Sequence, residues 1–144
     1  MSVTSNPDKY IRKAVYDLVN NITVSEKVIK CYDSRVTGNE NLTEYVLLTA
    51  QTKEVEKANK CDYRWETSLL IEIYTKTSSA GNSGSRLLLN DIEQAVYDLL
   101  SSGIEVDNGF EILKQNITFE NQLETVTDTE NIFRSFLRLN LTLI

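Results

Sequence analysis

The chain has 144 residues, of which 41% are hydrophobic and 25% are charged, and these values fit one globular domain and exclude a disordered chain. No apolar stretch approaches the ~20 residues of a membrane-spanning helix, and the first residues lack the basic and apolar regions of a signal peptide, so we expect a single domain over residues 1–144 with no membrane contact. Twenty-one acidic and fifteen basic residues give a net charge of −6, the wrong sign for a protein that binds nucleic acid by neutralising phosphates.

The first predicted element is a helix that begins at Asn6-Pro7. Asparagine can cap a helix, and proline suits its first position because the missing N–H costs nothing there. Apolar residues recur at helical spacing, and Asn20-Asn21 ends the pattern. The stripe consists of Ile11, Ala14, Val15, Leu18 and Ile22.

The next part of the chain predicts strands. Residues 27–36 give only a weak strand pattern, whereas residues 45–52 are apolar on both alternating faces, as in a strand that is covered on both sides. The polar residues 53–60 indicate a hairpin connection, because the next strand follows at once. That strand covers residues 63–75 and places Leu69, Ile71 and Ile73 on one face, which predicts one buried and one solvated side.

Small polar residues at 77–85 predict a flexible loop, in which a final serine can cap the helix that follows. This second helix covers residues 88–99, and Gly103 closes it. Residues 92–100 repeat six of the nine residues at 11–19, which we interpret as two helices with similar stripes lying side by side.

The last third predicts two strands. The apolar phase of residues 110–120 changes between Ile112 and Leu113, which indicates a β-bulge. A polar link at 125–130 then leads into a strand from 132 to the end. We therefore expect an α+β fold: a mostly antiparallel, mixed sheet of about five strands with two amphipathic helices packed on one face.

The two longest predicted strands suggest an assembly. Thirteen residues at ~3.4 Å each extend roughly 40 Å, which is similar to the diameter of a globule of this length. A strand that projects beyond the body exposes unpaired backbone groups, which proteins usually cover with another chain. Strand length is thus our main reason from the residues to expect oligomers.

Catalytic chemistry is not indicated. The chain has no histidine, no phosphate-binding or nucleophile motif and only two cysteines, Cys31 and Cys61, which we expect to be buried thiols. Glu66 and Glu72 are the acids placed on a rigid strand, but they are separated by roughly 20 Å along it. We expect no enzyme activity, no cofactor and no metal.

The order of these elements resembles the bacteriophage tail terminator family, the minor tail protein U-like proteins of phage necks. The resemblance covers nearly the whole chain and rests on patterns of apolar residues. These are the helix from Ile11 to Leu18, the Tyr45-Val46-Leu47-Leu48 strand, the strand from Trp65 to Tyr74, the helix from Asp91 to Leu100 and the arginine-bearing strand from Phe133 to Leu143. Relatives often have proline directly before the Tyr-Val pair, where this chain has Glu44.

This resemblance implies a structural protein of a tailed-phage virion, made in the host cytoplasm. It would form a homo-oligomeric ring, typically of six copies, that terminates the tail tube and joins it to the head–tail connector, while DNA passes without specific binding. We nominate two segments for contacts with neighbours: Lys53, Glu54, Glu56, Lys57 and Lys60 in the first, and Ser79, Gly81, Asn82, Ser83 and Gly84 in the second. Alternative interpretations are another neck or head-completion ring, or a small ferredoxin-like adaptor or regulatory module.

Overall fold

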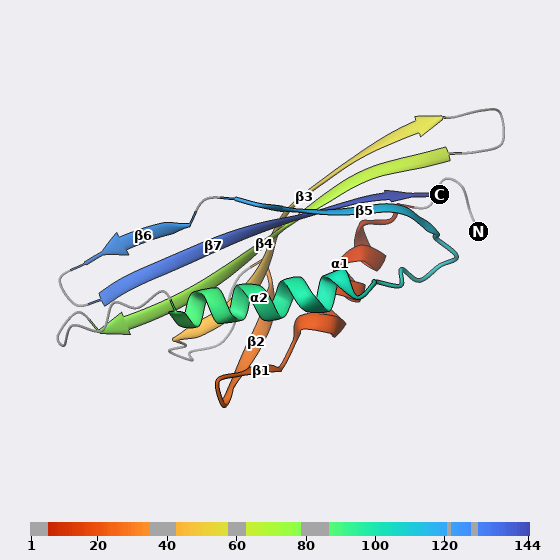
Figure 1. The fold of residues 1–144 in the computed structure, drawn as a ribbon. Coiled ribbons are helices and arrows are strands. Elements are labelled where there is room, and N and C mark those ends of the chain that lie inside the picture. The colour runs from red at the N-terminus through yellow and green to blue at the C-terminus, as the bar shows by residue number, and fades with distance from the viewer. Residues whose placement is uncertain (1–5, 35–42, 58–62, 79–86, 121, 128–129) are drawn as a thin grey trace.

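A computed structural model describes residues 6–34, 43–57, 63–78, 87–120, 122–127 and 130–144 of the chain. Within these residues the chain forms two helices and seven strands (Figure 1). In chain order they are α1 (Asp8–Val19), β1 (Ile22–Val24), β2 (Lys27–Asp33), β3 (Glu44–Lys57), β4 (Tyr63–Ser78), α2 (Leu87–Ser101), β5 (Ile112–Phe119), β6 (Leu123–Val126) and β7 (Glu130–Leu143). This order differs from the β-α-β-β-α-β arrangement of a ferredoxin-like domain.

The strands form one mixed sheet in the order β1-β2-β3-β4-β7-β5. β6 also pairs with β7, so β5 and β6 follow each other along the same edge. Every pairing is antiparallel except that of β2 with β3. The α+β class and the mostly antiparallel sheet agree with the prediction, but seven strands are described rather than about five. The two strands that the sequence did not indicate, β1 and β6, have only three and four residues.

The prediction of a hairpin connection at residues 53–60 was wrong for its first half. Residues 53–57 continue β3 and pair with residues 63–67 of β4. Their polarity misled the interpretation, because a strand near the end of a sheet needs no apolar face when water can reach both sides. The link predicted at 125–130 was wrong in the same way, since Thr125 and Val126 belong to β6 and pair with β7.

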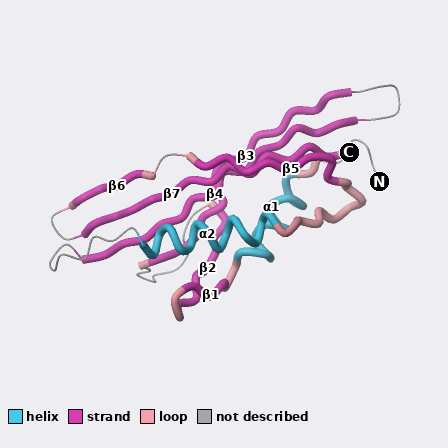
Figure 2. The backbone as a smooth tube through the Cα atoms, in the orientation of Figure 1, coloured by secondary structure: helices cyan, strands magenta, loops and turns pink. Residues whose placement is uncertain are grey.

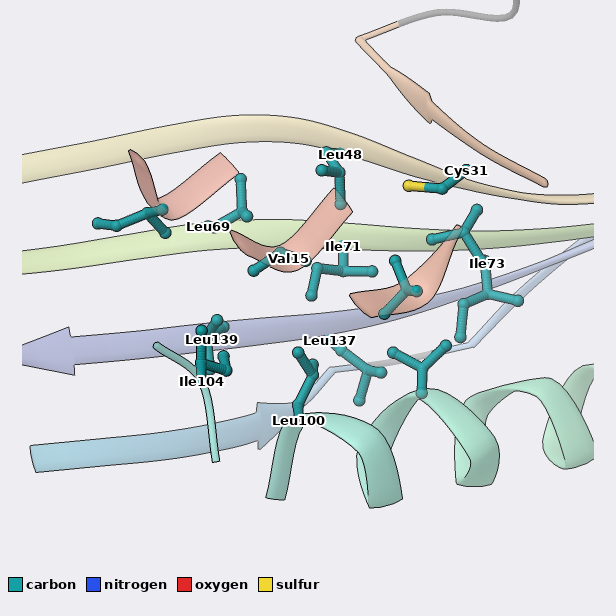
Figure 3. Close-up of a cluster of buried hydrophobic side chains, with 14 of the residues drawn as sticks. Val15, Cys31, Leu48, Leu69, Ile71, Ile73, Leu100, Ile104, Leu137 and Leu139 are labelled. Carbon is teal, nitrogen blue, oxygen red and sulfur yellow. The ribbon is translucent and has the colours of Figure 1, made fainter. Parts of the chain in front are cut away.

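The core lies between the sheet and the helices. Alternate residues of β4 and β7 enter it, among them the predicted Leu69, Ile71 and Ile73, and each helix adds one buried stripe (Figure 3). These stripes consist of Ile11, Val15 and Val19 in α1 and of Leu89, Ile92, Val96 and Leu100 in α2. We call the side of the sheet that carries these alternate residues the core face and the opposite side the outer face.

Local signals for the ends of elements agree with the structure at three places, and α1 begins at Asp8, directly after Pro7. The serine that was predicted to cap the second helix lies outside the described residues. The Oδ1 atom of Asn6 accepts a hydrogen bond from the N–H of Asp8 at 2.9 Å. Asn20 ends α1, and Gly103 follows α2 with a φ of +114°. The register of β5 against β7 shifts between Ile112 and Lys114, where the bulge was predicted.

The long strands carry the sheet beyond the helices. β4 has sixteen residues, which corresponds to roughly 50 Å, and β3 and β7 have fourteen each. Figure 2 shows that the β3–β4 hairpin extends beyond the helices at one end and the β6–β7 pair at the other. The sheet, rather than the helices, therefore sets the length of the molecule.

Candidate assembly interface

The β3–β4 hairpin carries the first of the predicted contact segments. Lys53 forms an ion pair with Asp8 of α1, with 2.6 Å between Nζ and Oδ2, so this side chain ties the hairpin to the helix. Glu54 lies directly opposite Glu66 in the pairing of β3 with β4. The structure thus gives Lys53 an intramolecular partner and leaves Glu54 beside a like charge.

The other nominated residues are only partly covered by the structure. Glu56 and Lys57 lie in β3 and pair with Arg64 and Tyr63 of β4. The remaining ones lie outside the described residues: Lys60, Ser79, Gly81, Asn82, Ser83 and Gly84. Cys61 is outside them as well, whereas Cys31 is a buried free thiol, as expected.

A second exposed surface lies along the edge formed by β5 and β6, and it was not predicted from the sequence. Four large apolar side chains are about half exposed or more there: Leu113, Phe119, Leu123 and Val126. Phe119 still packs on Tyr97 of α2, with 5.1 Å between the ring centroids. Apolar residues gathered on one edge of a sheet are typical of a contact surface.

The outer face combines aromatic residues with paired charges. The rings of Tyr45 and Tyr74 stack with 4.5 Å between their centroids, and burial, followed by the charge of Tyr74, raises the pKa of Tyr45 to about 12. Arg138 binds Glu120 at 2.8 Å. The Nε atom of Arg134 lies 3.7 Å from Oε1 of Glu72, and Lys76 pairs with Glu130. The charges of these three pairs therefore neutralise one another, and the two tyrosines are uncharged at neutral pH.

A groove between α1 and β2 contains several cations, including Lys9, Lys13 and Lys30. At its base, Arg12 binds Asp33 at 2.6 Å and donates to the carbonyl oxygens of Leu48 and Thr49. Arg12 therefore links α1 to β2 and β3 of the sheet.

Cys31 also lines this groove, and burial raises the pKa of its thiol to about 12, which keeps it protonated and unreactive at neutral pH. No group of three or more candidate metal ligands occurs among the residues that the structure covers. Within the same part of the chain, no helix is long and apolar enough to cross a membrane.

Comparison with known proteins finds a likeness in structure but none in sequence. No protein-family profile and no curated protein matches the sequence. A chain in the solved structure described as "Virion of native gene transfer agent (GTA) particle" matches with a TM-score of 0.63 and 12% sequence identity. The match covers 96% of this chain and 99% of the other. The two chains share a fold.

The coverage shows that the likeness extends over both chains and is not limited to a common sheet or hairpin. At 12% identity it concerns the arrangement of the elements and not individual side chains. It therefore supports the fold and identifies no contact residue.

Proposed function

We propose that this protein is a structural subunit of a tailed-phage-like virion. The observation that carries the proposal is the shared fold, along nearly the full length of both chains, with a chain of a gene transfer agent virion. The family that the sequence resembles belongs to the same class of particle. The two comparisons use different features, since one uses apolar patterns and the other uses the backbone.

Within the particle, we assign the protein to a homo-oligomeric ring at the neck. The ring would end the tail tube and connect it to the head–tail connector, so its partners are other copies of itself, the tube protein and the connector protein. Two surfaces support an oligomer: the projecting β3–β4 hairpin and the apolar edge of β5 and β6. Six copies is the number that the resemblance implies.

We further propose that the outer face of the sheet lines the channel, with the helices on the outside of the ring. A channel surface along which DNA moves should not bind its phosphates tightly. The pairing of Arg134 with Glu72 and of Arg138 with Glu120 suits this need, because a neutralised cation attracts phosphate weakly. The role requires positioning and closure rather than catalysis, and we propose that the protein is not an enzyme.

The test is whether the protein assembles and where it is found. Analytical ultracentrifugation and negative-stain imaging of the purified protein should show closed rings. Gold-labelled antibodies should mark one position, between head and tail, on particles from cells that make the protein. A stable monomer that is absent from such particles would refute the proposal. A small molecule that raised the melting temperature of that monomer would instead support the adaptor interpretation.

A further inference from the structure

Two unpaired strand edges occur at the end of the sheet that carries the β3–β4 hairpin. There the sheet consists of β3, β4, β7 and β5 side by side. β2 pairs with β3 only at residues 45–48, so within the described part of the chain residues 52–57 have a strand on one side only. β5 is the last strand on the opposite side. Such edges pair readily with another strand.

The two edges lie at the same level along the strands. Glu54 of β3 lies opposite Glu66 of β4, and Glu66 lies opposite Thr142 of β7. Thr142 in turn lies opposite Lys114 of β5. One row across the outer face therefore begins with a carboxylate at one edge and ends with an ammonium group at the other.

The neighbouring row is apolar from edge to edge. Val55 lies opposite Trp65, which lies opposite Leu143, and Leu143 lies opposite Ile112. Val55 is about half exposed, and Ile112 is partly exposed. Both edges thus offer apolar surface in the same row.

The strand directions also match. Each neighbouring pair among these four strands is antiparallel, so β3 and β5 run in opposite directions. Rotation about an axis that runs roughly along the strands does not reverse them. β5 of one copy can therefore meet β3 of the next in antiparallel orientation, and repetition of this head-to-tail contact closes a ring.

The charges favour this neighbour over others. Like charges directly opposite each other on adjacent strands are destabilising, and no ion pair joins Glu54 or Glu66 to a basic side chain among the described residues. Lys114 is exposed. When the sheets of two copies pair so that their rows are continuous, Lys114 of one copy lies next to Glu54 of the other. The ammonium group then offsets the repulsion between Glu54 and Glu66.

We propose that β5 of one copy pairs with residues 52–57 of β3 in the next copy, with Lys114 beside Glu54, so that the sheet continues around the ring. The inference rests on the proposed ring and specifies the surfaces that form it.

Charge exchange provides the test. Glu54→Lys and Lys114→Glu each replace an attractive pair with a repulsive one, which should weaken each interface roughly 2- to 30-fold, measured as the concentration at which rings dissociate. The double variant should restore assembly. Glu54→Lys places a cation opposite Glu66 within the same hairpin, so its folded monomer should melt no lower than the wild type.

Two control variants carry the same charge changes elsewhere on the surface. Asp91→Lys on α2 and Lys9→Glu on α1 alter exposed side chains that lie on neither edge. Both should leave the concentration at which rings dissociate unchanged, because the strength of the contact depends on the pairing of Lys114 with Glu54 and not on net charge.

Carbodiimide coupling gives a direct readout in rings and in purified particles. It should join Lys114 to Glu54, and mixed isotope labelling should show that the two residues belong to different copies. If the wild type forms rings and both single variants form them equally well, this inference is wrong, although the proposed function stands. Coupling of Lys114 to an acid other than Glu54 would have the same meaning. Absence of the protein from all rings and particles would overturn both.

Discussion

Arg12 illustrates how a single residue joins two layers of this fold. Its guanidinium group binds Asp33 of β2, donates to the backbone carbonyl oxygens of Leu48 and Thr49 in β3, and contacts Gln51. These carbonyl groups lie where the pairing of β3 with β2 ends. The planar guanidinium satisfies several acceptors at once, which a lysine cannot do.

We expect Arg12→Ala to lower the free energy of unfolding by about 2 to 3 kcal/mol, because it removes the ion pair with Asp33 and the hydrogen bond from Arg12 to the Thr49 carbonyl oxygen. Arg12→Lys should recover only part of the loss. Lys13→Ala, on the exposed side of the same helix, should change stability by less than about 0.5 kcal/mol and serves as the control. Urea denaturation measures all three. Equal effects of Arg12→Ala and Lys13→Ala would contradict the assigned role.

Among the elements, the two helices bury the same pattern but end differently. α1 ends at Asn20, whose Oδ1 accepts a hydrogen bond from the N–H of Cys31, so the tertiary fold stabilises that end. α2 is followed by Gly103 in a left-handed conformation, and a Cβ atom at that position would meet nothing within 4 Å. A side chain at residue 103 would therefore lower stability only through the strain of the positive φ.

Gly103→Ala should therefore lower the free energy of unfolding by about 1 to 2 kcal/mol. Gly103→Asn should cost less, since asparagine tolerates positive φ better than alanine does. Ser101→Ala, which changes an exposed residue inside α2, should have little effect. Thermal and chemical denaturation report these values. An alanine variant as stable as the wild type would show that this turn can adopt another conformation.

For the whole molecule, high pH should weaken the fold. Burial raises the pKa of Cys31 from 9.0 to about 12 and that of Tyr45 from 10.0 to about 12, so both groups release protons more readily when the chain unfolds. Their stabilising contribution is complete below pH 9 and is lost progressively as the pH rises toward 12. The pKa of Tyr74 is raised in the same direction.

The free energy of unfolding should thus be level up to about pH 9 and should decline above it. Cys31→Ala and Tyr45→Phe remove one titrating group each, so each should decline less steeply than the wild type even where its overall stability is lower. Urea titrations between pH 8 and 11 measure the slopes. Parallel slopes for the wild type and both variants would exclude these two groups as the cause.

The sequence by itself determined the helices, the long strands and the absence of familiar catalytic motifs. Periodicity is a local property, so Ile11 and Val15, or Leu69 and Ile71, reveal their element without reference to the rest of the chain. Asn6 and Gly103 marked the ends of helices for the same reason, since capping depends on neighbouring residues.

Only the tertiary structure decided the strand order, the length of β3 and the identity of the exposed edges. Residues 53–57 are polar except for Val55, and they form a strand because β4 pairs with them. Leu123 and Val126 are apolar yet exposed because β6 lies at an edge. The alignment of Glu54 with Lys114 depends on three successive registers between strands distant in sequence. Local patterns do not encode such registers, because cross-strand pairing is a property of the whole sheet.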